Sequence, residues 1–280
     1  MSCIKRYECT LSPKLLEKAV KELNEPRDNE KRLQAIDELR NNYDAEKFGP
    51  LVREDDEFFL RFLRAKKFNQ KKALTVLQNY HNVKKEFKEV FGKVNNPAVL
   101  TPIIEKEVMM MLPGVAKNGA AVMLSRHGLI DKDMDIYDFM AYGVFSMEKL
   151  LEDEAIQING IATIKDLENF NMTFFTKISP LALGKMTKVW QEAMPMRYKE
   201  SHVVNEGTFY DVIMAIVRPF LKKKLLDRIH LHGTNFKGIH EFIDPSILPP
   251  YLDGTGPDPD GLAKLWGETL MEDMPQDTAL

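Results

Sequence analysis

The 280-residue chain has only two cysteines, Cys3 and Cys9, and both lie near its N-terminus. Two thiols cannot form a disulfide framework for a chain of this length, so we expect a reducing, cytoplasmic environment. The first ten residues are polar and charged, without the apolar run of a secretory signal. No stretch reaches the roughly 18 uninterrupted apolar residues that a membrane span requires. These absences predict a protein that folds without disulfides or membrane-spanning segments.

The chain also lacks a strong excess of charge of either sign. Its formal net charge is −3, from 39 lysines and arginines against 42 aspartates and glutamates. A protein that binds nucleic acid over much of its surface carries a net positive charge, so we do not expect a nucleic-acid partner. Local basic patches remain compatible with this balance.

Motifs that would indicate catalysis are missing. The sequence contains no P-loop, dinucleotide-binding, zinc-protease or serine-hydrolase motif and no paired CxxC. Asp131, Asp133 and Asp135 have the spacing that opens an EF-hand, but Ile136 and Tyr142 stand where glycine and glutamate are required. We interpret this run as a solvated turn and the start of a helix.

Two further pairs of residues are candidates, one for a metal site and one for a catalytic site. His230 and His232 would share one face of a predicted strand, but no third ligand is evident, which favours structural histidines over a metal site. Ser125 and His127 are close in sequence, and this alone does not establish a hydrogen bond between nucleophile and base. We therefore predict no catalytic residue, no metal site and no enzyme activity.

The periodicity of apolar residues divides the chain in two. Residues 1–95 contain only two glycines and show helical periodicity, with predicted helices from Ser12-Pro13 to residue 23 and over 27–41, 55–66 and 69–91. Beyond them, strand-like runs alternate with helical ones, which predicts a largely parallel sheet with covering helices. The strands are expected at 121–124, 160–164, 202–204 and 228–232, and the helices at 134–152, 179–194, 208–217 and 235–242. We predict a helical domain over 1–95 and an α/β domain with a C-terminal tail over 96–280.

Residues 208–228 combine an apolar helix with a cationic run. Pro219 ends or kinks the helix, and basic residues follow immediately. This order suits a flap that covers an apolar cavity and meets an anionic membrane. A core-facing helix with a solvated charged end explains the same periodicity. The apolar stripe consists of Phe209, Val212, Ile213, Ile216, Val217 and Phe220, and the cations are Lys222, Lys223, Lys224 and Arg228.

Four ordered passages resemble the CRAL-TRIO lipid-binding family, most closely its tocopherol-transfer and retinaldehyde-binding branches. They are residues 56–68, residues 150–160, residues 218–233 and residues 247–255, although Leu252-Asp253 depart from the common pattern of the last passage. The resemblance implies an α/β fold in which a helical N-terminal domain is followed by a mixed, mostly parallel β-sheet with covering helices and a helical gate. It also implies a carrier that is not an enzyme and needs no cofactor. Such a carrier binds one hydrophobic lipid, such as tocopherol, a retinoid or a similar isoprenoid.

The resemblance further implies which residues form the site. The gate would consist of Phe209, Ile213, Val217, Phe220 and Leu221. Gly143 and Met147 stand where relatives present hydroxyl groups, so the identity of the ligand does not carry over. The pocket would be lined by Met140, Gly143, Met147, Ile161, Thr163, Phe170, Ile178, Val189, Trp190, Met194, Met196, Val212 and Ile216.

A basic cluster implied by the tocopherol-transfer branch would bind phosphoinositide headgroups through charge-assisted hydrogen bonds. Its members would be Lys66, Arg197, Lys224 and Arg228. The expected partners are therefore a hydrophobic lipid and, transiently, an anionic phosphoinositide membrane, with the protein itself a cytoplasmic monomer. Three alternatives stay open: a phosphatidylinositol or phospholipid carrier, a membrane-recruited scaffold with a vestigial pocket, and an enzyme with an unrecognised α/β site.

Overall fold

The computed structural model describes residues 6–272 and residue 274, and the chain forms two units. The first unit contains residues 1–87, 150–159 and 187–197. The second contains residues 88–149, 160–186 and 198–280. The sequence patterns divide the chain after residue 95 and give no sign that the two later segments pack with the N-terminal helices. Local periodicity carries no information on such long-range packing.

Side-chain caps begin the helices of the first unit. Ser12 Oγ accepts a hydrogen bond from Leu15 N at 3.4 Å, and Pro13 occupies the first helical position, which confirms the predicted start. The helix expected over 69–91 ends earlier, because Phe87 leaves the helical conformation (φ −126°, ψ 56°). The elements are α1 (Pro13–Leu23), α2 (Asn29–Asn41), α3 (Ala45–Phe48), α4 (Asp56–Ala65), α5 (Gln70–Glu86), α9 (Glu154–Asn159) and the π-turn η2 (Val189–Ala193).

A network of buried charges joins the helices of the first unit. The Glu25 carboxylate accepts hydrogen bonds from Arg32 Nε at 2.8 Å and from Arg64 Nε and Nη2 at 2.9 and 3.0 Å. Arg64 also donates to Glu154 Oε1 at 2.8 Å and to Gln157 Oε1 at 2.9 Å. Burial alone would lower the pKa of Arg64, but Glu25 and then Glu154 offset this, and the pKa is raised. The guanidinium groups thus stay charged inside the unit because each is paired.

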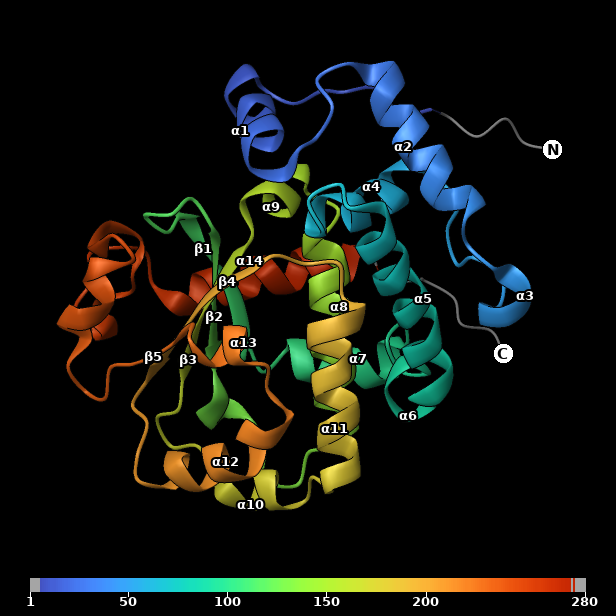
Figure 1. Ribbon diagram of the computed structural model, residues 1–280. Coiled ribbons are helices and arrows are strands. Elements are labelled where there is room, and N and C mark those ends of the chain that lie inside the picture. The colour runs from blue at the N-terminus through green and yellow to red at the C-terminus, as the bar shows by residue number, and fades with distance from the viewer. Residues whose placement is uncertain (1–5, 273, 275–280) are drawn as a thin grey trace. The chain divides into compact units, whose positions relative to one another are not determined.

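The second unit is organised around one five-stranded sheet in the order β1-β2-β3-β4-β5. Strand β1 is antiparallel to β2, and the other neighbours are parallel. This arrangement confirms the predicted mixed, mostly parallel sheet. Figure 1 shows the strands at the centre of the unit. The strands are β1 (Met109–Val115), β2 (Ala121–Arg126), β3 (Ile161–Asp166), β4 (Tyr198–Val204) and β5 (Ile229–Leu231).

Strand β1 has no clear sequence signal, because Pro113 interrupts it. Its pairing with β2 shifts in register between Met111 and Val115. Proline cannot donate to a ladder and is tolerated on an edge strand, where one side needs no partner. The edge position of β1 in the fold therefore explains a strand that the alternation of residues does not predict.

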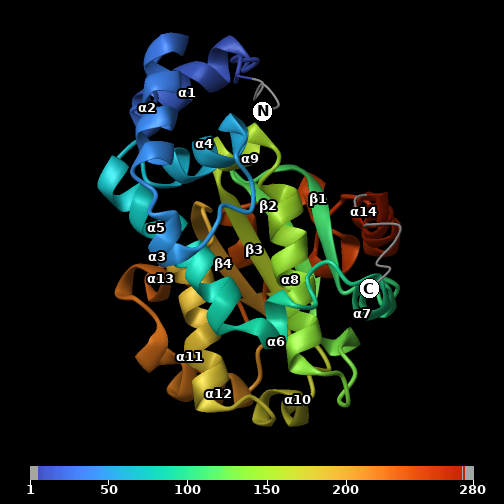
Figure 2. The same ribbon diagram turned by 90° about the vertical axis from the view of Figure 1, so that its right-hand side faces the viewer.

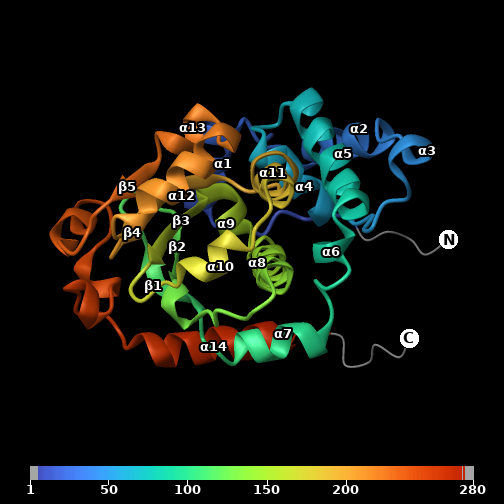
Figure 3. The ribbon, with the colours of Figure 1, turned by 90° about the horizontal axis from the view of Figure 1, so that it is seen from below.

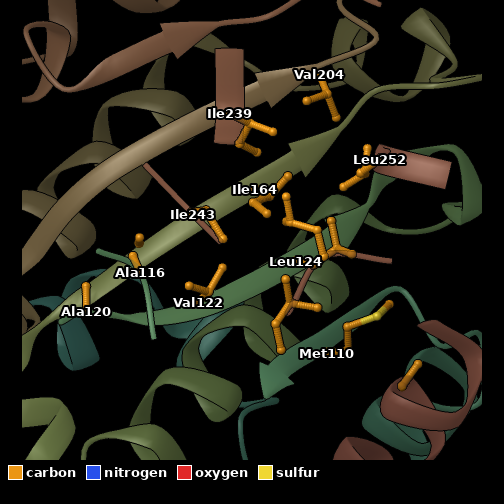
Figure 4. Packing of buried hydrophobic residues seen from close by; sticks show 14 residues of the cluster. Met110, Ala116, Ala120, Val122, Leu124, Ile164, Val204, Ile239, Ile243 and Leu252 are labelled. Carbon is orange, nitrogen blue, oxygen red and sulfur yellow. The ribbon is translucent and has the colours of Figure 1, made fainter. Parts of the chain in front are cut away.

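One face of the sheet packs into the main hydrophobic core. Ala162 and Ile164 of β3 lie in it with Val122 and Leu124 of β2, all with no exposed area. Residues 236–252 and α14 supply the opposite side of this core (Figure 4). Since residues alternate along a strand, Ile161, Thr163 and Lys165 point to the other face.

Helices and 3-10 turns surround the sheet on both faces. Figure 3 shows α8, α10 and α12 on one side of the sheet, and the chain after β5 on the other. The α-helices of this unit are α6 (Lys88–Phe91), α7 (Pro97–Ile104), α8 (Ile136–Leu150), α10 (Met172–Thr176), α11 (Pro180–Lys188), α12 (Phe209–Val217), α13 (Lys223–Leu226) and α14 (Pro259–Glu272). The 3-10 helices are η1 (His127–Leu129), η3 (Arg218–Phe220), η4 (Phe236–Glu241), η5 (Pro245–Ile247) and η6 (Pro250–Leu252).

Other segments also differ from expectation. The helix predicted over 235–242 is the 3-10 helix η4, and the helix predicted over 179–194 divides into α11 and η2. The tail contains α14, which lies beside α7 (Figure 2) and buries Ala263, Trp266 and Leu270. Within the described residues, no helix has the length and apolar character needed to cross a bilayer.

Candidate functional site

Five aromatic rings gather where three parallel strands end. His127 directly follows β2, Phe170 follows β3 and Phe209 follows β4, while Phe139 comes from α8 and Phe174 from α10. In open α/β sheets, ligands bind outside the carboxyl ends of the strands. We call His127, Phe139, Phe170, Phe174 and Phe209 the aromatic cluster.

The rings of the aromatic cluster contact one another mostly edge to face. Phe170 lies 6.1 Å from His127, 6.5 Å from Phe174 and 5.8 Å from Phe209, measured between ring centroids. Phe139 lies 6.0 Å from His127 and 5.8 Å from Phe174. Each such pair contributes about 0.5 to 1.5 kcal/mol beyond burial. Phe209 brings the start of α12 into this cluster, so the predicted gate helix touches the predicted pocket residue Phe170.

Ser125 and His127 form a polar pair at the edge of the aromatic cluster. Ser125 Oγ lies 3.1 Å from His127 Nε2 and donates to the Ile164 carbonyl at 3.3 Å. Because the single hydroxyl proton goes to that carbonyl, Ser125 accepts the imidazole N–H. Burial, followed by the charge of Lys165, lowers the pKa of His127 to about 3, so the ring is neutral near pH 7. This arrangement orients His127 as a donor and gives Ser125 no general base.

Most predicted pocket residues of the second unit lie on elements that flank this site. Met140 and Met147 of α8 are buried, and Gly143 between them is partly buried. Ile161 and Thr163 are buried on the sheet face opposite the main core. The Thr163 hydroxyl lies 2.6 Å from Tyr198 OH and donates to Ser201 Oγ at 3.3 Å, and Ile178 is partly buried between α10 and α11.

The remaining predicted pocket residues are placed differently. Val212 and Ile216 on α12 are 54% and 45% exposed, so they lie on the accessible side of their helix. Four others belong to the first unit: Val189 and Met194 are buried, and Trp190 and Met196 are partly buried. A lining role for all of these residues stays a prediction.

The predicted gate helix is apolar but not buried. Pro219 ends it as expected: α12 stops at Val217 and the 3-10 turn η3 follows. Ile213 and Val217 are partly buried one and two turns after Phe209, as is Leu221 beyond η3. Phe220 is 37% exposed and packs against Gly184 of α11.

The four predicted phosphoinositide ligands differ in how they are held. In the first unit, Lys66 caps the end of α4, and the Arg197 guanidinium donates to the Ile158 carbonyl and to Glu22 Oε2, the latter at 3.4 Å. In the second unit, Lys224 lies exposed on α13, and the Arg228 guanidinium donates to the Tyr198 carbonyl. Two of the four cations therefore bind main-chain oxygens.

Sequence patterns missed part of this site. The sequence patterns do not single out Phe139 and Phe174, and the predicted strand ends at residue 164, one residue before Lys165, whereas β3 extends to Asp166. The signal for Lys165 was present: it shares the odd-numbered face of β3 with Thr163, opposite the core-facing Ile164. Alternation along the strand could have assigned it to the site.

Histidines on β4 and β5 form a second cluster on the core side of the sheet. His202 pairs with His230 in the strand register, and their rings stack with centroids 5.2 Å apart. His202 Nδ1 lies 3.0 Å from His232 Nε2, and Phe242 packs on the rings. His202 is the third imidazole that the sequence did not reveal, yet stacked rings do not converge on one point. No group of three or more ligands suited to a metal occurs among the residues the structure describes.

The pKa of His202 predicts how this residue makes the free energy of unfolding depend on pH. Burial, followed by the charges of His232 and His230, lowers the pKa of His202 from 6.5 to about 3. In the unfolded chain, His202 has its ordinary pKa of 6.5 and binds a proton more readily than in the folded protein. The contribution of His202 to the free energy of unfolding is therefore complete above pH 6.5 and is lost as the pH falls toward 3. Between pH 6.5 and 4.5, we expect His202→Asn to reduce the slope of unfolding free energy against pH by roughly 1 kcal/mol per unit. Urea titrations over this range measure the slope, and equal slopes in both proteins would contradict the assignment.

The three aspartates whose spacing resembles the start of a calcium loop each form an ion pair with a lysine. Asp131 lies 2.6 Å from Lys106 Nζ, Asp133 lies 3.7 Å from Lys177 Nζ and Asp135 lies 2.9 Å from Lys93 Nζ. Each carboxylate therefore has a cation of the same unit beside it, which agrees with the interpretation as a solvated turn.

Comparison with known proteins agrees with the fold. Residues 105–254 match the model of the CRAL/TRIO domain, and residues 14–79 match that of the CRAL/TRIO N-terminal domain. The alpha-tocopherol transfer protein-like protein of Homo sapiens is 32% identical over 266 residues, covering 95% of this chain and 76% of that protein. Clavesin-1 of Xenopus laevis is 33% identical over 266 residues, covering 93% of this chain and 78% of that protein. The crystal structure of Sfh5 has a TM-score of 0.53 and 14% identity, covering 94% of this chain and 98% of that one, and shows the fold alone.

The second unit thus combines a mixed sheet, an aromatic cluster where its parallel strands end and an unburied apolar helix beside that cluster. The matched models cover both the N-terminal helices and the sheet. The chain belongs to the CRAL/TRIO family of hydrophobic ligand-binding proteins.

Proposed function

We propose that this protein is a non-enzymatic carrier that binds one hydrophobic lipid, of the size of tocopherol or a retinoid, and exchanges it at anionic membranes. The name of the human relative, alpha-tocopherol transfer protein-like, supports a lipid of this class. The polar atoms of Ser125 and His127 satisfy one another, which supports binding without chemistry. The carrier would act as a cytoplasmic monomer that attaches to membranes transiently.

The observation that carries this proposal is the exposure of helix α12. None of its nine residues is buried, although all except Tyr210 and Asp211 are apolar. Apolar side chains stabilise a protein only when they leave water. A lipid beneath Phe209, Ile213 and Val217 would cover one side of the helix, and a membrane would cover the other.

The binding energies are consistent with a carrier. Enclosing about 500 Å² of apolar lipid surface contributes on the order of 12 kcal/mol at about 25 cal/mol per Å². The loss of translational and rotational freedom subtracts several kcal/mol. The remainder corresponds to a dissociation constant between roughly nanomolar and micromolar, which permits both stable carriage and release.

The proposed attachment to membranes is supported by a stripe of exposed apolar side chains that lies next to lysines in the chain. Leu181, Val212, Ile216 and Phe220 are 72%, 54%, 45% and 37% exposed, and the contact of Phe220 with Gly184 brings α11 and η3 together. We call these four residues the exposed stripe. Lys222, Lys223 and Lys224 follow it in the chain and are exposed. Apolar side chains next to lysines suit the interface of an anionic bilayer, and we include Lys66, Arg197 and Arg228 with Lys224 as proposed phosphoinositide ligands.

The test is the identity and amount of lipid that the protein holds. The full chain would be purified without detergent, extracted with organic solvent and analysed by mass spectrometry. We expect about one single-chain lipid per protein, and we expect the delipidated protein to take up tocopherol or retinal from vesicles. Stoichiometric phospholipid instead would support the phospholipid-carrier alternative. Absence of any lipid, together with no uptake of tocopherol, retinal or phospholipid, would refute carriage.

A further inference from the structure

A lysine stands in the middle of the sheet on the face that carries the candidate site. Lys165 lies on β3, between Ser125 of β2 and Val203 of β4 in the strand register. Its neighbours Ile164 and Asp166 point to the opposite face, where Ile164 belongs to the main core. The ammonium group therefore extends toward the side on which α8, α10 and α12 lie (Figure 3).

Within the part of the chain that the structure describes, no carboxylate forms an ion pair with Lys165. No hydrogen bond of its ammonium group is found among these described residues either. Asp166, the adjacent carboxylate, accepts hydrogen bonds from Asn205 Nδ2 at 2.8 Å and from Glu168 N at 2.9 Å. Burial and then the positive charge of Lys165 lower the pKa of His127 to about 3, so the imidazole is neutral near pH 7. The positive charge thus faces a site built from aromatic rings and neutral polar groups.

The hydroxyl and imidazole groups of the neighbouring strands are paired with one another. Ser125 Oγ and His127 Nε2 bind each other, and the hydroxyl groups of Thr163, Tyr198 and Ser201 form their own chain. Lys165 is therefore the cation on this face of β3 that can bind a ligand. A partly buried cation without a partner is unfavourable, and a ligand that brings an anion removes this cost.

We propose that Lys165 determines the specificity of the site by binding the carboxylate of an acidic single-chain lipid, whose apolar chain contacts the aromatic cluster. This inference rests on the proposed carrier function and narrows its cargo from single-chain lipids in general to those that end in a carboxylate. A charge-assisted hydrogen bond in a site of low polarity contributes roughly tenfold to hundredfold in affinity. Recognition is non-covalent, since the ammonium group donates hydrogen bonds and the carboxylate accepts them.

The experiment compares two lipids that differ only at the head group. The delipidated full chain is titrated with cis-parinaric acid, a fluorescent fatty acid, and with its methyl ester. We expect the wild-type protein to bind the acid at least about tenfold more tightly than the ester. Lys165→Met nearly keeps the length of the side chain but removes its charge, so we expect the acid and the ester to bind with equal affinity. Lys165→Arg should retain the preference for the acid.

The control is Lys237→Met, which removes an exposed lysine of η4 on the other side of the sheet. It should leave the preference for the acid unchanged, and thermal unfolding should show that each variant is folded. Equal wild-type affinity for acid and ester, or a preference that survives in Lys165→Met, would overturn the role of Lys165 while leaving the carrier function standing. Failure to bind the acid and the ester by a protein that still takes up tocopherol or retinal would also overturn the role of Lys165, whereas failure with all of these lipids would overturn the carrier function itself.

Discussion

Glu25→Gln is expected to lower the free energy of unfolding by about 3 to 5 kcal/mol. The carboxylate of Glu25 is 1% exposed and accepts hydrogen bonds from Arg32 and Arg64, whose side chains have no exposed area. The amide of glutamine has nearly the same shape but no charge. Two guanidinium groups would then remain buried with one fewer negative charge, and one amide N–H would face them. Urea denaturation of both proteins at pH 7 measures the difference.

Glu17→Gln provides the matched control. Glu17 also pairs with two cations, Lys21 at 3.3 Å and Arg27, but on the exposed surface of the first unit. Exposed ion pairs contribute little because water solvates the separated charges nearly as well. The control should therefore unfold at the same urea concentration as the wild-type protein. If Glu25→Gln behaved like Glu17→Gln, the buried network would not be a main source of stability in the first unit.

The double substitution Val212→Asp and Ile216→Asp is expected to weaken association with anionic vesicles by about 100-fold. Both side chains are about half exposed in the protein, so a membrane could withdraw from water about half of the surface of each. That contribution is roughly 1 kcal/mol per residue, and a carboxylate in its place must also lose part of its hydration. Flotation with vesicles that contain phosphoinositide measures the change, and binding of lipid in solution should persist.

Leu265→Asp is the control for this prediction. Leu265 is 59% exposed on α14, which lies beside α7 and away from α12 (Figure 3). The same change from an exposed apolar residue to a carboxylate should leave vesicle association unaltered. Equal loss in both variants would show that the effect is one of net charge, and no loss in either would remove the exposed stripe from the membrane contact.

The sequence predicted the elements that have strong local signals. Ser12 followed by Pro13 marks the start of α1, and the run from Ile161 to Ile164 is apolar and rich in β-branched residues, as expected for a central parallel strand. The six apolar residues between Phe209 and Phe220 predicted the helix α12 and its end at Pro219. Motifs spread over the chain added the family, which the comparisons confirm.

The candidate site was predicted less completely. Phe170 and Phe209 were named, but the edge-to-face cluster that joins them with His127 depends on where β2, β3 and β4 end relative to one another. Val212 and Ile216 were assigned to the pocket on the basis of resemblance, yet they lie on the exposed side of α12. Helical periodicity gives the stripe of a helix, but not which side of a two-sided apolar helix faces the protein.

By itself, the amino-acid sequence determined the helices and parallel strands that have strong local signals, such as α1, β3 and α12, because these signals depend on residues within one or two turns of each other. Only the tertiary structure decided that Glu25 neutralises Arg64, 39 residues away, and that His202 stacks on both His230 of β5 and His232, which follows β5. It also decided that Lys165 lies beside Ser125 on the face of the sheet that carries the aromatic cluster. The physical reason is that the energy of a charge depends on its solvent exposure and on partners brought near it by the path of the chain, which no local pattern encodes.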